Sequence, residues 1–155
     1  IISNEICEGN KRYKNFKKDI VIGKIDPKSK EYNDLVFVNK NVQSLKIPSS
    51  IERISTHSFS YSLIENITIP VNVKEINDFA FRSCKKLRQV QFLKNSKIQE
   101  IGENAFEFTS IETIIMPVPI RYKVFGFCYK LRKVSFTENC QNCAIENEAF
   151  VDSPI

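Results

Sequence analysis

Several features on which enzymes and membrane proteins depend are absent from this chain of 155 residues. It has four glycines, none of them in a G-x-G or G-x-x-x-x-G-K setting, so the common phosphate-binding loops are missing. No run approaches the roughly 18 uncharged apolar residues of a membrane-spanning helix. The single histidine, His57, has no recognisable nucleophile and orienting acid around it, which favours a structural role. The sequence therefore predicts a protein that is not an enzyme.

Composition indicates an ordinary folded domain, with 42% apolar residues, 26% charged residues and a net charge of +5. Part of the positive charge lies in KRYKNFKK, residues 11–18. We interpret this segment as a solvated flank, with a patch for nucleic acid or another anionic surface as the less favoured alternative. The chain begins IISNE, without an initiator Met or an apolar leader, so we expect an excised or mature segment.

The five cysteines are odd in number and irregular in spacing, which does not indicate a disulfide framework. Cys140 and Cys143 form C-x-x-C, but no second pair of metal ligands is near in the sequence. Free thiols or a loop disulfide are therefore favoured over a metal site. Cys84 and Cys128 recur at one position of a repeat and are expected to be buried packing residues. No metal or cofactor is predicted.

An internal repeat of 20 to 24 residues runs from residue 42 to the end of the chain. Each unit reads L-x-x-I-x-I, often then proline, then V-x-x-I and x-x-x-A-F. The units begin at Val42, Ile64, Leu87, Ile111, Leu131 and Ile155. One coil of this length cannot cover its own apolar side, whereas stacked coils bury it jointly. The period therefore predicts a solenoid.

The spacing within a unit predicts how each coil is built. In L-x-x-I-x-I the last two apolar residues are two apart, so they share the inward face of a short strand. Strands of successive coils are then expected to lie parallel, about 4.8 Å apart, in one continuous sheet. Pro48, Pro70 and Pro117 follow strand segments, where a missing N–H ends the ladder. The Ala of A-F is expected at a tight turn, and the Phe is expected to fill the wide end of the coil.

The units also alternate between two types. Those beginning at 64 and 111 follow Ser or Thr and carry proline, whereas those at 87 and 131 follow cysteine and carry the insertions LKNSK and TENCQNC. The second strand position accordingly runs Glu65, Arg88, Glu112, Arg132. Such lateral pairs are worth roughly 0.2–1 kcal/mol each and help to set the register. The terminal SPI restarts the first type at Ile155, so further coils are expected in the parent protein.

Residues 1–40 lack the full repeat and are predicted to form an N-terminal cap, because a solenoid needs an atypical end unit. Within them, DIVIGKID and NDLVFVNKN read as two short strands joined by the turn PKSKEY. The repeats are assigned to residues 41–155, with coils starting near 42, 64, 87, 111 and 131.

The stretch LIENITIPVNVKEINDFAFRSCKKLRQVQF resembles the BspA-type leucine-rich repeat, and the resemblance extends over residues 42–155. Its most specific part is A-F, then x-x-C, then L-x-x-V. Ser58 and Val124 replace the Ala of A-F, and the fourth unit is about three residues short, which puts the regularity of that coil in question.

The resemblance implies a leucine-rich repeat solenoid: a β-rich arc of the α/β type, with a parallel strand sheet on one face and about five coils behind the cap. It also implies a surface antigen, at the cell surface or secreted, that adheres to host cells, matrix or other microbes. The ligand would be a protein or a glycan.

The predicted binding residues are the outward third and fifth positions of the strand segments. Most are neutral and polar, and Ile115 is the one bulky apolar group among them. An exposed Ile ringed by amides and hydroxyls is typical of an adaptable contact patch, although an ordinary solvated sheet face would look similar. The predicted site comprises Gln89, Gln91, Thr113 and Ile115, with Asn66 and Thr68 beside them and Lys46 and Lys133 at the edges.

Asn66 begins the sequon NIT, and a glycan there would cover part of the predicted site. Such short sequons often arise by chance, and we expect this one to be unoccupied. Two functions of different classes fit the sequence. The favoured one is a non-enzymatic adhesion module. The alternative is an intracellular interaction scaffold that uses residues 11–18 on an anionic partner, with nucleic acid not the expected one. Glycan and disulfide analysis of the native protein separates the two, because both modifications indicate export.

Overall fold

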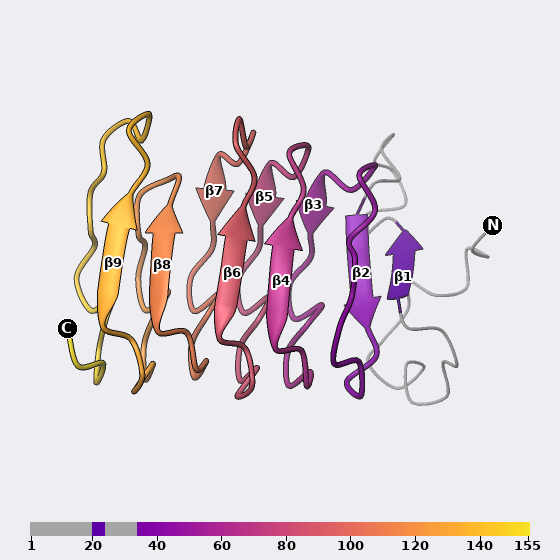
Figure 1. The fold of residues 1–155 in the computed structure, drawn as a ribbon, viewed down its shortest axis with the longest axis horizontal. Helices are drawn as coiled ribbons and strands as arrows, with labels where there is room; N and C mark the ends of the chain where they lie inside the picture. The colour runs from indigo at the N-terminus through magenta and orange to yellow at the C-terminus, as the bar shows by residue number, and fades with distance from the viewer. Residues whose placement is uncertain (1–19, 24–33) are drawn as a thin grey trace.

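A computed structural model of the chain describes residues 20–23 and 34–155. All regular elements in these residues are strands, and the coils stack in a row of about five turns along the long axis (Figure 1). The strands are β1 (Ile20–Gly23), β2 (Asp34–Val38), β3 (Arg53–Ile54), β4 (Asn66–Ile69), β5 (Glu75–Ile76), β6 (Gln89–Phe92), β7 (Glu100–Ile101), β8 (Thr113–Met116) and β9 (Lys133–Phe136).

The strands form two faces. On one face, which we call the back sheet, the order is β1-β2-β3-β5-β7, with every pair parallel except the antiparallel pair of β1 and β2. On the other, which we call the strand face, β4 pairs with β6 and β8 pairs with β9, both in parallel (Figure 1). This arrangement confirms the predicted solenoid with parallel strands on one face.

The predicted continuity of the strand face is wrong. No ladder joins β6 to β8, and the first strand segment, residues 42–47, forms no strand. The back sheet also stops at β7, beyond which only an isolated bridge joins Ile120 to Ile145.

The end of the back sheet has a physical reason in the fourth unit, which advances only 20 residues and is too short after β8 for a back strand in register with β7. The break between β6 and β8 lies before this shortened part. Backbone hydrogen bonds in the turns that hold the A-F residues still join the third and fourth coils. Phe106 N donates to Val124 O at 3.0 Å, and Phe108 N donates to Gly126 O at 3.0 Å. The irregular fourth coil suspected from the sequence is therefore confirmed.

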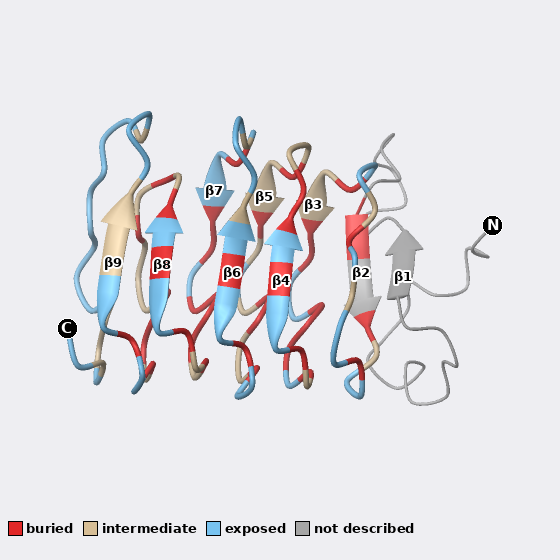
Figure 2. Ribbon diagram, viewed as in Figure 1, coloured by how far each residue is buried: buried red, intermediate tan, exposed pale blue. Residues whose placement is uncertain are grey.

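Buried residues line the inside of the stack, while strand residues alternate between inside and outside (Figure 2). In β4, Ile67 and Ile69 are buried and Asn66 and Thr68 are exposed, because successive strand side chains point to opposite faces. The inward positions predicted from the two-residue spacing of apolar residues in the strand segments are therefore confirmed.

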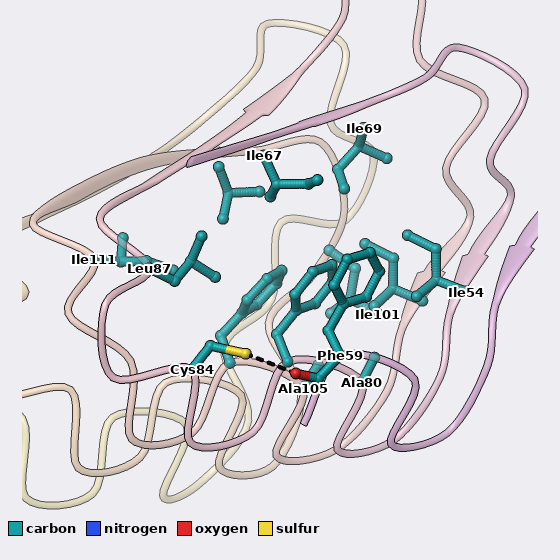
Figure 3. Close-up of a cluster of buried hydrophobic side chains, with 14 of the residues drawn as sticks. Ile54, Phe59, Ile67, Ile69, Ala80, Cys84, Leu87, Ile101, Ala105 and Ile111 are labelled. Carbon is teal, nitrogen blue, oxygen red and sulfur yellow. Dashed lines mark hydrogen bonds between the residues drawn. The ribbon is translucent and has the colours of Figure 1, made fainter. Parts of the chain in front are cut away.

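A column of phenylalanine rings runs through the core. Phe59, Phe81, Phe106 and Phe125 are fully buried, and consecutive ring centroids are 4.5, 5.2 and 5.7 Å apart. Figure 3 shows Phe59 within this buried core. Phe150 continues the column at 5.9 Å from Phe125 but is only half-buried. The prediction that the Phe of A-F fills the coil is confirmed.

The alternating thiols join neighbouring coils. The Cys84 thiol donates a hydrogen bond to the Phe59 carbonyl at 3.1 Å and lies 3.4 Å from the Ser62 hydroxyl (Figure 3). Cys128 makes the same bond to the Phe106 carbonyl at 3.1 Å. Burial raises the pKa of Cys84 to about 11 and also raises the pKa of Cys128. Both cysteines are therefore packing residues, as predicted.

At the N-terminal end, the two predicted strands are confirmed as β1 and β2. Leu35 and Val38 of β2 are buried in the same core as the repeats, and Leu35 lies in register with Ile54 of β3. Residues 11–18, the turn at 24–33 and Cys7 lie outside the described residues. The domain boundary at residue 40 stays a prediction.

The turns of the coils use a left-handed backbone conformation that the sequence did not predict. In the described part of the chain, twelve non-glycine residues have positive φ, and ten of them form two rows that recur from coil to coil. The rows are His57, Phe79, Asn104, Lys123 and Glu148, and Tyr61, Ser83, Phe108, Phe127 and Asp152. Their φ values are those of the left-handed region, which asparagine and glycine tolerate best. Most of these residues are of other types, so the residue types gave no local signal.

Candidate interaction surface

The outward positions of the strand segments lie where the sequence predicts. Nine of the ten side chains are exposed, and Ser135 of β9 is half-buried. Parallel register sets Asn66 beside Gln89 and Thr68 beside Gln91, so the amides and hydroxyls form two short rows across β4 and β6. Because the backbone ladder fixes the spacing of these rows, they form a rigid polar surface.

A hollow of about 580 Å³ lies over the first three coils and is lined by both polar and apolar residues. We call it the polar hollow after the outward amides and hydroxyls that line it. It receives outward side chains from each of these coils, together with Leu45 and Leu93 at its margins. Its main polar residues are Ser44, Lys46, Asn66, Thr68, Gln89 and Gln91. Five of the eight predicted site residues are therefore brought together here.

The other three predicted site residues lie apart from the polar hollow. Thr113 and Ile115 are on β8, across the break in the strand face, and Lys133 begins β9. Ile115 is 58% exposed, as expected for an outward position. The predicted patch around Ile115 therefore spans the break between β6 and β8 and is not one continuous surface.

The charges on the strand face are sparse and largely unpaired. Lys46 and Lys133 form no ion pair within the described part of the chain. Of the alternating charges at the second strand position, Arg132 and Glu112 approach to 3.9 Å, and the described residues show no such contact between Glu65 and Arg88. The lateral pairing predicted from the alternation is therefore confirmed at one junction only.

His57 has a structural environment. Its Nδ1 lies 3.0 Å from the Ser60 hydroxyl, and its ring stacks on Phe79 with centroids 5.0 Å apart. Desolvation, and then the charges of Arg82 and Lys40, lower the pKa of the imidazole. These contacts account for the residue without a chemical role.

The C-x-x-C pair lies in the loop that follows β9. Cys143 is exposed, Cys140 is half-buried, and the Cys143 thiol donates to the Cys140 carbonyl at 2.9 Å. Desolvation, and then the neighbouring Cys143, raise the pKa of Cys140 to about 11. Residues 20–23 and 34–155 contain no group of three or more His, Cys, Asp or Glu side chains that could hold a metal ion. They also contain no helix long and apolar enough to cross a membrane.

Several residues that line the polar hollow were not predicted as site residues, and they include Ser49 and Leu93. Leu93 is 39% exposed and begins the insertion LKNSK, which replaces the proline of the alternate unit. An apolar residue at the start of an insertion beside an outward row is the signal that could have identified it.

Solved structures similar to this chain include the following two. The pneumococcal vaccine antigen PcpA has a TM-score of 0.60 and 20% identity, with 81% of this chain and 44% of that chain covered. A leucine rich cell surface protein from Faecalibacterium prausnitzii A2-165 has a TM-score of 0.56 and 21% identity, with 79% and 42% covered. At these identities the likeness concerns the fold, and the chain spans less than half of either protein.

No curated protein matches the sequence of this chain. The profile described as the BspA type leucine rich repeat region, however, matches residues 30–155 in six copies. The matched residues include every coil of the solenoid and both aligned rows of the polar hollow. The chain belongs to the BspA-type leucine-rich repeat family.

Proposed function

We propose that the chain is a non-enzymatic adhesion module, displayed at the cell surface or secreted, that binds a macromolecular partner on its strand face. The partner is a protein or glycan of a host cell, of the matrix or of another microbe. The observation that carries this proposal is the polar hollow, in which outward side chains from three successive coils converge.

The chemistry of the polar hollow suits recognition. Amides and hydroxyls both donate and accept hydrogen bonds, so the rows of Asn66 with Gln89 and Thr68 with Gln91 can match varied polar groups. Leu45 and Leu93 add apolar contact area at the margins. A rigid scaffold reduces the entropy lost on binding, and a few central residues can dominate the affinity.

Ile115 provides a second contact on the same face. Its side chain is 58% exposed on β8, beyond the break in the strand face. A partner large enough to span β6 and β8 would reach both Ile115 and the polar hollow, and this favours a macromolecule over a small ligand.

The nature of the two structural neighbours supports display at the surface. One is called a vaccine antigen and the other a cell surface protein. Family membership is consistent with this location, because both neighbours share the solenoid fold.

A matched pair of substitutions tests the proposal. Gln91→Arg places a bulky cation in the polar hollow, whereas Gln99→Arg makes the same change at an exposed position beside β7 on the back sheet. We expect Gln91→Arg to weaken binding to cultured epithelial cells and their deposited matrix by about tenfold or more, which corresponds to about 1.4 kcal/mol. Gln99→Arg should bind like the parent. Equal binding by both variants, or a loss confined to Gln99→Arg, would contradict the proposal.

A further inference from the structure

Two basic turns lie at the edge of the solenoid where the strands of the strand face begin, at the bottom of Figure 1. One precedes β6 and the other precedes β9, so they recur in alternate units of the repeat. The first is closed by a hydrogen bond from Leu87 N to Cys84 O at 2.9 Å. Lys85 and Lys86 are the two central residues of this turn, and both are exposed, as is Arg88 after it. A tight turn directs its central side chains into solvent, so the two lysines project from the coil.

The second turn repeats the first in the fifth unit. It is closed by a hydrogen bond from Leu131 N to Cys128 O at 2.9 Å. Its central residues are Tyr129, which is 67% exposed, and Lys130, which is also exposed. Lys133 follows at the start of β9 and is exposed as well.

In the coil between the two basic turns, the corresponding turn before β8 is one residue shorter. This turn therefore does not project from the coil as the basic turns do. There Ser110 N bonds to Leu87 O of the preceding coil at 3.0 Å, and the Ser110 hydroxyl donates to the Lys85 carbonyl at 2.7 Å. The phenylalanine rings of the same three coils are 5.2 and 5.7 Å apart, close to two strand spacings, so the basic turns lie about 10 Å apart. We call residues 84–88 and 128–133 together the basic turns.

Of the nine other cations in the described part of the chain, five form ion pairs. Arg53 pairs with Glu75 at 2.9 Å, Lys123 pairs with Glu148 at 3.3 Å, and Arg121 pairs with Glu100. In contrast, five of the six cations of the basic turns form no ion pair with the described residues. These are Lys85, Lys86, Arg88, Lys130 and Lys133. The arrangement leaves a net positive charge on this edge, with Glu65 and Glu112 as the acidic residues stacked beside the basic turns.

We propose that the basic turns bind a sulfated glycan chain, at a site distinct from the polar hollow. Two clusters of lysines about 10 Å apart match a linear polyanion, because each cluster can neutralise a successive anionic group and release its counterions. The exposed ring of Tyr129 offers a flat apolar face beside these charges. The choice of a sulfated glycan over a nucleic acid rests on the proposed display at the cell surface.

Binding to immobilised heparin tests this site in the 155-residue chain. All proteins carry glutamine in place of the five basic residues within 11–18, so that this segment does not contribute. We expect Lys85→Gln with Lys86→Gln to weaken binding about tenfold or more, and Lys130→Gln with Lys133→Gln to act similarly. The matched control, Lys94→Gln with Lys97→Gln, removes the same charge from exposed positions in the loop after β6 and should change binding less than about threefold. Heparin binding should also fall about tenfold or more between about 50 and 200 mM salt.

Three results would overturn the proposal. The first is an absence of heparin binding once residues 11–18 are neutral, and the second is an equal loss in the Lys94 and Lys97 control, which would indicate net charge alone. The third is equal or tighter binding to single-stranded DNA or to polyglutamate, which would exclude a sulfated glycan as the preferred partner.

The Gln91→Arg variant separates this site from the proposed adhesion site, because it should keep full heparin binding even where cell binding is lost. Loss of heparin binding in Gln91→Arg would contradict two separate sites.

Discussion

Truncation of Phe81 to alanine tests the repeat register at the centre of the phenylalanine column. The Phe81 ring is fully buried and stacks between Phe59 at 4.5 Å and Phe106 at 5.2 Å. A buried Phe→Ala change costs about 3–5 kcal/mol, and the loss of two ring contacts places Phe81 toward the upper end of that range. Phe150 provides an internal comparison, because it is half-buried and has one ring contact, with Phe125 at 5.9 Å. Phe150→Ala should cost roughly 1–2 kcal/mol.

Urea unfolding followed by circular dichroism and tyrosine fluorescence measures both values, because the chain has five tyrosines and no tryptophan. The slope of the free energy of unfolding against urea should stay close to that of the parent, so that the midpoint reports stability. A loss below about 1 kcal/mol for Phe81→Ala would refute the register. A larger loss for Phe150→Ala than for Phe81→Ala would refute the column as the main source of core packing.

Three further predictions concern the surface and the cysteines. Ile115→Asp should weaken adhesion about tenfold or more with little change in thermal stability, because the side chain points outward, and unchanged cell binding would remove β8 from the site. Lys46→Glu should weaken adhesion mainly through salt-dependent association. Burial raises the pKa of Cys84 from 9.0 to about 11, so the unfolded chain loses this proton first as the pH rises. The stability that this thiol contributes is complete below pH 9 and should fall by roughly 2–3 kcal/mol as the pH approaches 11, a loss that Cys84→Ser should not share. Elemental analysis should find no stoichiometric zinc, and about one zinc per chain that disappears in Cys143→Ser would show that a metal site had been missed.

The sequence predicted the core well because the core depends on spacing. A period of 20 to 24 residues with apolar positions two apart in each strand segment specifies which side chains point inward, and Ile67, Ile69 and Phe81 are buried accordingly. The alternation of hydroxyl and thiol residues before each unit also predicted burial of Cys84. These features repeat, so each unit supports the interpretation of the others.

The break between β6 and β8 could not be predicted with the same certainty, because ladder hydrogen bonds depend on the exact path of two coils. The short fourth unit signalled an irregularity but did not show that both faces would be interrupted. The shape of the polar hollow could not be predicted either. It depends on the position of Leu93 in the LKNSK insertion and on the first strand segment, residues 42–47, which forms no strand. The left-handed residues were hidden because side chains such as Phe79 and Lys123 do not favour that conformation.

The central claim, that a partner docks on the polar hollow, is tested most directly by lysine footprinting of the chain bound to epithelial cells and their matrix. Lys46 lines the polar hollow, whereas Lys94 is exposed in the loop after β6 and lies outside the residues that line it. Acetylation of each lysine is measured by mass spectrometry for the free and the bound chain. Binding on the polar hollow predicts that Lys46 becomes protected about threefold or more while Lys94 reacts as in the free chain. Protection of Lys94 with Lys46 still fully reactive would contradict the account and place the partner on another surface.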